Sequence, residues 1–126
     1  MRAALKVGEF ELYYQPIVDL KSNEINAFEA LIRWNHPVRG MVAPLDFIPL
    51  AEESGLIVPM GEWVLRNACA EAAKWSKDVR VTVNLSPVQF KNRHLVEMVV
   101  SAITAAGLAP NRLELEITES VLLNDS

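Results

Sequence analysis

Three polar residues interrupt apolar, strand-like segments of this sequence. Glu29 stands within FEALIRW, Asn84 within VTVNLS and Glu116 within LELEITES. A carboxylate among Leu, Ile and Trp is costly to bury unless a cation or a hydrogen-bond donor compensates it. Two carboxylates and an amide are hard oxygen donors, which suit Mg²⁺ or Mn²⁺ better than Zn²⁺. Together the three residues predict one oxygen-rich cation site shared by three strands.

Glu29 and Asn84 also have ordinary structural interpretations. Glu29 and Arg33 fall on one face of a strand, roughly 13 Å apart, so they cannot pair with each other. Each could pair with a different neighbour, or the two could serve one site that holds both a metal and a phosphate. Asn84 could simply cap the turn before Pro87, a common place for this residue.

The acidic residues near the end of the sequence are open to the same alternatives. Glu114 and Glu116 alternate in one strand, and one of them is expected to be solvated. Glu119 follows at a loop-like position, where capping of a following helix is the ordinary expectation. Singly, none of these residues identifies a function.

Composition limits the classes of protein to consider. The 126 residues amount to one domain or part of one, and 51% of them are hydrophobic, so a sizeable core is available. A net charge of −4 argues against binding to a nucleic-acid polymer or to an anionic membrane surface. The single cysteine, Cys69, cannot form an intrachain disulfide, which favours a reduced, cytoplasmic setting.

No targeting or membrane-spanning segment is expected within this sequence. Glu9, Glu11 and Asp19 interrupt the apolar run that a signal peptide would need. No run approaches the roughly 18 apolar residues of a membrane span, so any membrane anchor would lie in sequence outside these residues.

Period and turn signals predict the order β, β, α, α, β, α, β after a lead-in over residues 1–9. A short polar segment at 21–24 joins the first two strands, and so short a link implies an antiparallel hairpin. Residues 35–43 are expected to form a loop. The expected elements are strands over 10–20 and 25–34, a helix over 44–54, a longer helix opened by Pro59, a strand over 79–85, a helix at about 94–106 and a strand at 113–117.

The last two strands flank a helix, which predicts a parallel βαβ unit with a right-handed crossover. Helices are then expected on both faces of the sheet. Asn84 and Glu116 fall toward the carboxyl ends of their strands, where α/β enzymes place their sites.

Five segments of the sequence resemble, in order, the motifs of the EAL domain family. They are YYQPIV at 13–18, EALIRW at 29–34, DFIPLAE at 46–52, VNLS at 83–86 and EITES at 116–120. The resemblance covers nearly the whole chain from about Phe10. The family fold is α/β, a modified TIM (β/α)8 barrel with an antiparallel first strand, which agrees with the hairpin expected from loop length.

The resemblance implies metal-dependent hydrolysis of cyclic di-GMP to linear pGpG. It implies that Glu29, Asn84 and Glu116 hold Mg²⁺ or Mn²⁺ ions, two in the complete domain, with Glu29 also catalytic and Glu119 in a supporting role. It implies that Gln15, Leu31 and Arg33 contact the substrate.

The resemblance also implies that residues 1–126 are a partial EAL domain, with about four of eight barrel strands. The family's downstream Asp pair, Lys and later Glu have no counterpart here, so the segment is expected to be inactive alone. The open half-barrel is expected to form a homo-oligomer or strand-exchanged dimer, and the parent protein to carry regulatory domains. The alternatives are a degenerate module that binds cyclic di-GMP without cleaving it, and an oligomerisation module.

Overall fold

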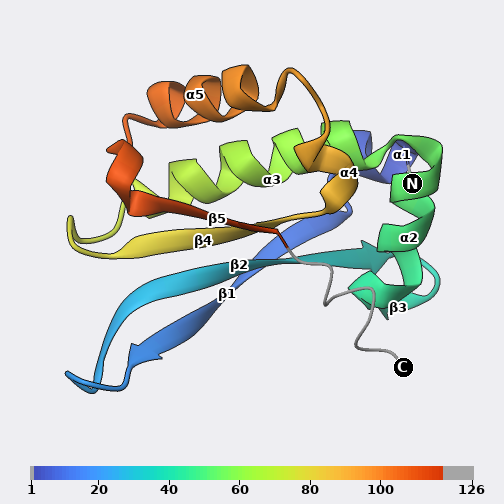
Figure 1. Cartoon of the computed structure of the whole chain (residues 1–126). Coiled ribbons are helices and arrows are strands. Elements are labelled where there is room, and N and C mark those ends of the chain that lie inside the picture. The colour runs from blue at the N-terminus through green and yellow to red at the C-terminus, as the bar shows by residue number, and fades with distance from the viewer. Residues whose placement is uncertain (1, 118–126) are drawn as a thin grey trace.

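The computed structural model describes residues 2–117, and it contains a mixed sheet with helices on one side (Figure 1). The elements are α1 (Arg2–Val7), β1 (Phe10–Asp19), β2 (Glu24–His36), β3 (Gly40–Val42), α2 (Pro44–Ser54), α3 (Ile57–Ala72), β4 (Arg80–Leu85), α4 (Pro87–Phe90), α5 (Leu95–Ala106), a 3-10 turn (Pro110–Arg112) and β5 (Leu113–Ile117).

The sheet has the strand order β1-β2-β4-β5, with β3 paired to the outer end of β2. β1 and β2 form the expected antiparallel hairpin, from Phe10 opposite Trp34 to Asp19 opposite Glu24, with a register shift between Ile17 and Val18. β2 pairs with β4 in parallel, and β4 pairs with β5 in parallel. The α/β fold with an antiparallel first strand is therefore confirmed.

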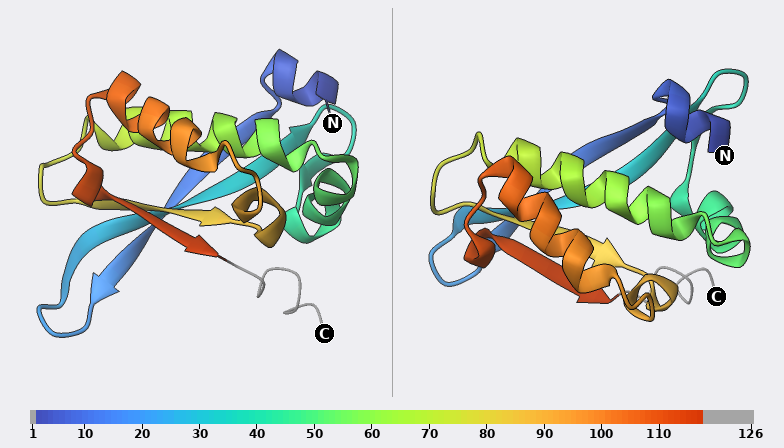
Figure 2. Two further views of the ribbon diagram at one scale, coloured as in Figure 1. Left: turned by 45° about the horizontal axis from the view of Figure 1, so that its top comes forward. Right: turned by 90° about the horizontal axis from the view of Figure 1, so that it is seen from above.

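One face of the sheet is packed against α3 and α5, which lie side by side along β4 and β5 (Figure 2). Val81, Val83 and Leu85 alternate along β4 and are at most 2% exposed, so this face of β4 belongs to the core. The core also contains the buried face of α3, namely Val64, Leu65, Ala68, Cys69 and Ala72.

The opposite face of the sheet has no helix over it within residues 2–117 (Figure 1). The prediction of helices on both faces is wrong for the described residues, because every crossover between the parallel strands returns on the same side. The polar residues that alternate with the core residues lie on this face, where Gln15 and Glu116 are exposed but Thr82, between Val81 and Val83, is only 2% exposed.

A second core lies at the other end of α3. Phe10, Phe47 and Met60 are each at most 3% exposed, and they join α1 and α2 to the sheet. Phe10 stacks on Trp34 with ring centroids 5.6 Å apart, so the start of β1 and the end of β2 are fixed by one aromatic cluster. Residues 1–9, expected only as a lead-in, thus include the helix α1.

The segment expected as a loop at 35–43 contains part of β2 and all of β3. His36 closes this hairpin, because its Nδ1 accepts hydrogen bonds from the backbone N–H groups of Val38 and Arg39 at 3.1 and 3.2 Å. Gly40 has φ +75°, a left-handed conformation that favours glycine. Pattern reasoning missed the strand because it is only three residues long.

The first-turn proline of α3 misled the prediction of where that helix starts. α3 begins at Ile57 rather than at Pro59. Pro59 is tolerated as the third helical residue because the first N–H groups of a helix have no intrahelical partner.

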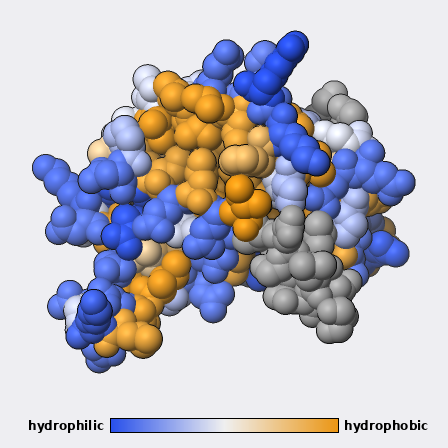
Figure 3. All heavy atoms as spheres, in the orientation of Figure 1, coloured by the Kyte–Doolittle hydropathy of each residue, from blue (hydrophilic) through white to orange (hydrophobic). Residues whose placement is uncertain are grey.

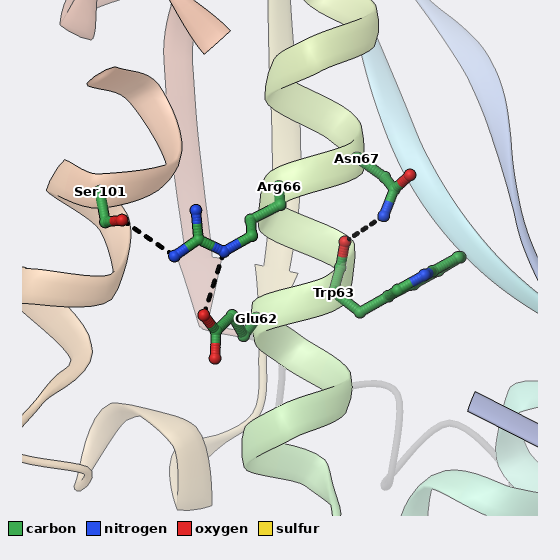
Figure 4. A network of polar contacts seen from close by, with 5 residues as sticks. All are labelled: Glu62, Trp63, Arg66, Asn67 and Ser101. Atoms are coloured by element: carbon green, nitrogen blue, oxygen red, sulfur yellow. Dashed lines mark hydrogen bonds and ion pairs between the residues drawn. The ribbon is translucent and has the colours of Figure 1, made fainter. Parts of the chain in front are cut away.

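A polar network ties α3 to α5 on the outside of the molecule (Figure 4). The Arg66 guanidinium donates to Glu62 Oε2 at 3.0 Å one turn away and to Ser101 Oγ of α5 at 2.9 Å. Exposed pairs of this kind contribute at most about 1 kcal/mol, so the network orients the two helices more than it stabilises them.

Apolar surface gathers over the region of α5 (Figure 3). Val96 and Val100 of α5 contribute to it, at 73% and 52% exposed, and a smaller apolar area lies on the β1–β2 hairpin, where Leu20 is 94% exposed. Within the described residues, no helix is both long and apolar enough to cross a membrane.

The single cysteine gives a test of this core. Burial raises the pKa of the Cys69 thiol to about 11, and the residue is 0% exposed. We expect iodoacetamide at pH 8 to label the folded protein at least 100-fold more slowly than the urea-unfolded protein, since the thiolate is the reactive form. Mass spectrometry over time measures both rates, and equal rates would show that Cys69 is not in a stable core.

Candidate functional site

Four polar side chains form a row across the sheet. Gln15 lies opposite Glu29 in the β1–β2 register, Glu29 lies opposite Thr82 in β2–β4, and Asn84 lies opposite Glu116 in β4–β5. Directly opposed residues share a face, and so do residues two apart in one strand. The row therefore lies on the face of the sheet that α3 and α5 leave open.

Glu29 and Asn84 are in direct contact although they are 55 residues apart in sequence. The Asn84 side-chain Nδ2 donates a hydrogen bond of 2.8 Å to Glu29 Oε2, and both side chains are partly buried. This contact follows from the register, because Asn84 is two residues beyond the partner of Glu29 and hence diagonal to it.

The other end of the Asn84 amide is unusual. Its Oδ1 is buried, and among residues 2–117 no donor forms a hydrogen bond with it. An unsatisfied buried acceptor costs about 1–3 kcal/mol, so such an atom calls for an explanation. A bound cation is one, because Mg²⁺ and Mn²⁺ are hard cations that take oxygen ligands, and an amide oxygen can complete a set of carboxylates.

Among residues 2–117 no hydrogen bond joins Glu116 to either of the other two expected metal ligands, Glu29 and Asn84. Glu116 is exposed, and it is placed beside Asn84 by the strand register. Among residues 2–117 no three His, Cys, Asp or Glu side chains cluster in a way that could hold a metal ion. A cation on this face would thus need the amide of Asn84 as well as the carboxylates.

Glu114, the other acidic residue of β5, has a structural partner. It forms an ion pair with Arg80 of β4 on the same face of the sheet. Glu116 has no such basic partner among the described residues, which leaves its carboxylate available for a ligand.

Leu31 and Arg33 extend the open face toward the carboxyl end of β2. Both line a pocket of about 150 Å³, whose other walls come from α2, α3 and the end of β4, including Asn84. Arg33 Nη1 donates to the Ile32 carbonyl at 2.9 Å, and its guanidinium carbon lies 5.8 Å from the centre of the Tyr13 ring. These contacts use only part of the donor capacity of the guanidinium.

Gln15 is separate from this pocket. It is exposed on β1 opposite Glu29, so it borders the carboxylate of Glu29 rather than the cavity. Glu119 lies outside the described residues.

Sequence reasoning missed three residues next to this site. Tyr13 lies under the Arg33 guanidinium, and nothing in its spacing indicated that. Ser86 and Gln89 also line the pocket, and they cap the short helix α4, which was not expected. The pattern Ser-x-x-Gln after a strand is the signature of a capping box and could have revealed it. Ser86 rather than Asn84 is thus the residue that caps the turn before Pro87.

Comparison with known proteins gives consistent results. The sequence model described as "EAL domain" matches residues 1–126. The uncharacterized protein y4lL of Sinorhizobium fredii is 54% identical over 125 residues, which is 99% of this chain and 15% of that protein. The bifunctional diguanylate cyclase/cyclic di-GMP phosphodiesterase MucR of Pseudomonas aeruginosa is 42% identical over 130 residues, 100% of this chain and 19% of that protein.

A solved structure gives the same result in three dimensions. The phosphodiesterase PaMucR in complex with c-di-GMP superposes with a TM-score of 0.90 at 42% identity. The match covers 98% of this chain and 52% of that one. The chain thus spans about half of that solved chain and less than a fifth of the two curated relatives.

The contact between Glu29 and Asn84 predicts how a charge at position 84 would act. Asn84→Asp replaces a donor by a second carboxyl, and two adjacent carboxylates cannot both ionise freely. The pKa of one of the two carboxyl groups is therefore higher in the folded variant than in the unfolded one. The variant keeps its stability at low pH, where that group is protonated, and loses stability as the pH rises. Without metal, we expect the variant to be about 1–3 kcal/mol less stable than the wild type at pH 8 and nearly equal to it at pH 4.

Urea unfolding at both pH values, in the presence of a chelator, measures this effect. Asn111→Asp, an exposed site away from the row, is the control and should show no comparable pH dependence. A pH-independent difference at position 84 would contradict the observed contact.

Proposed function

This chain belongs to the EAL domain family, and on that premise we propose that it forms the N-terminal part of a domain that hydrolyses cyclic di-GMP to linear pGpG. The proposed cofactor is Mg²⁺ or Mn²⁺. The proposal extends to this chain the activity of its relatives, several of which are cyclic di-GMP phosphodiesterases.

The observation that carries the proposal is the oxygen-rich row on the open face. Glu29 supplies a carboxylate, and Asn84 supplies a buried oxygen that has no donor among the described residues. Glu116 lies opposite Asn84 with a carboxylate that forms no ion pair within residues 2–117. These donors fit a hard divalent cation, and we propose that the three residues hold it. When bound, such a cation makes hydroxide available near neutral pH and stabilises negative charge on the phosphate.

The remaining residues are proposed to hold the substrate. Arg33 stands at the rim of the pocket with a planar fork of donors, which suits a phosphate group because it can donate two parallel hydrogen bonds. Leu31 supplies an apolar wall beside it, and Gln15 offers an amide next to Glu29. Glu119 is proposed to support the site from the segment after β5.

The accessibility of this face supports a site that is only partly built by the described residues. Gln15 and Glu116 are exposed. Hydrolysis is helped by a site that surrounds the reacting atoms and excludes bulk solvent other than the attacking water. We therefore propose that residues 1–126 are a partial EAL domain, inactive alone, and that further residues complete the site in the cytoplasmic parent protein.

A second candidate function is binding of cyclic di-GMP without cleavage. It is favoured by the separation of the pocket from the carboxylates, because Leu31 and Arg33 line the cavity and Glu29 and Glu116 do not. A module that had lost the downstream catalytic residues would keep this pocket. Tight binding of the nucleotide with no release of pGpG in the complete domain would favour this reading.

The hydrolase proposal predicts the effect of removing the central carboxylate. In the complete domain with Mg²⁺, we expect Glu29→Ala to lower the turnover of cyclic di-GMP at least 1,000-fold and to weaken Mn²⁺ binding. The free energy of unfolding should change by only about 1 kcal/mol. Chromatography of pGpG and Mn²⁺ titration measure the two effects.

Glu114→Ala is the matched control, since Glu114 lies on the same face and is bound to Arg80. It should retain turnover within a few-fold. Near wild-type turnover of Glu29→Ala would show that Glu29 is not a ligand.

Self-association of the 126-residue chain is a separate expectation of the open sheet. Among residues 2–117 no strand pairs with the outer edge of β5, and Leu115 and Ile117 on that strand are 39% and 51% exposed. Open edges and apolar surface promote pairing with another chain. Light scattering should give a mass of at least twice 14.1 kDa, and a compact monomer would contradict this expectation.

A further inference from the structure

We propose that Gln89 is a positioning residue for Asn84. Its side chain, held between Gly61 of α3 and the backbone of Ser86, fixes the turn that leaves β4 and so fixes the amide of Asn84 against Glu29. This inference rests on the proposed function only for the metal, since the contact between Asn84 and Glu29 is observed without it.

The turn after Asn84 depends on a capping box. Ser86 Oγ accepts a hydrogen bond of 3.3 Å from the backbone N–H of Gln89, and Gln89 Oε1 accepts one of 2.9 Å from the backbone N–H of Ser86. Ser86 and Gln89 are 8% and 6% exposed. α4 has only four residues, and a helix this short is not stable by itself. The two reciprocal hydrogen bonds of the capping box therefore set the backbone path after β4.

The amide end of the Gln89 side chain packs against α3 at Gly61, which has no side chain. A Cβ atom on Gly61 would lie 1.8 Å from Gln89 Nε2 and 2.9 Å from its Cδ. Any residue other than glycine would displace the amide. Glycine inside a helix costs about 1 kcal/mol relative to alanine, so its presence in the second turn of α3 requires a reason, and the close packing of Gln89 supplies one.

The capping box and the packing of Gln89 on Gly61 lie directly beside the candidate site. Gly61, Ser86 and Gln89 line the same pocket as Asn84 and Arg33. The orientation of Asn84 matters because its two ends are chemically opposite, an Nδ2 that donates to Glu29 and an Oδ1 left for a cation. A shift of the turn at Ser86, two residues on, would move the Asn84 amide relative to Glu29 and so weaken this hydrogen bond.

The test compares variants that disturb Gln89 from both sides in the complete domain. Gln89→Met keeps the volume and removes the acceptor for Ser86, and Gly61→Ala displaces the amide. Both are expected to raise the dissociation constant for Mn²⁺ about tenfold, as is typical when a residue that orients a metal ligand is lost. Leu108→Ala, which removes a buried side chain from the core around α5, is the control for lost stability alone.

A second readout is independent of metal. The side-chain amide resonances of Asn84, assigned by their loss in Asn84→Asp, report the hydrogen bond to Glu29. We expect them to shift toward the values of a solvent-exposed amide in Gln89→Met and Gly61→Ala, and to stay unchanged in Leu108→Ala at a similar loss of Tm.

The outcomes separate the two proposals. A lower Tm in Gln89→Met with unchanged Asn84 resonances would overturn the positioning role. A wild-type domain that binds no Mn²⁺ would count against the proposed function alone, because the amide resonances still decide the role of Gln89.

Discussion

The parallel pairing of β2 with β4 is the constraint on which the site depends. It sets Glu29 opposite Thr82, and the period of two then places Asn84 diagonally across from Glu29 on the same face. A shift of one residue in this register would turn Asn84 toward the helices and Val83 toward the open face. The buried series Val81, Val83 and Leu85 opposes such a shift, because each would leave the core. The apolar side of β4 therefore enforces the geometry of its polar side.

The helix α3 likewise supports both the core and the candidate site. α3 presents Leu65, Ala68 and Ala72 to the sheet, and these small and medium side chains let the helix lie close to β4. At its other end α3 carries Gly61, where the space is filled by a side chain from the segment after β4. One helix thus supports both the strand that carries Asn84 and the turn that follows it.

The sequence alone indicates most of the architecture, and its failures have physical causes. α5 is predictable because its apolar residues recur with the helical period over several turns, whereas β1 and β2 are predictable from their aromatic and branched residues and the short polar turn between them. β3 and α4 have three and four residues, too few for a period to show. The row of polar residues can be read from strand alternation, which places Glu29, Asn84 and Glu116 on defined faces. The pairing of strands distant in sequence cannot be read that way, so the Glu29–Asn84 contact is not visible before the fold is known. The position of Tyr13 under Arg33 depends on the exact register of the β1–β2 hairpin, which the turn signal alone does not fix.

The two kinds of strand pairing also differ in how they arise as the chain is synthesised. Partners in the β1–β2 hairpin are separated by between 5 and 24 residues, from Asp19 with Glu24 to Phe10 with Trp34. Glu29 and Asn84 are separated by 55. The entropy of closing a loop grows with its length, so the hairpin can close while the rest of the chain is still on the ribosome. The antiparallel first strand can thereby form early, whereas the contact between Glu29 and Asn84 closes a longer loop and is expected to form later.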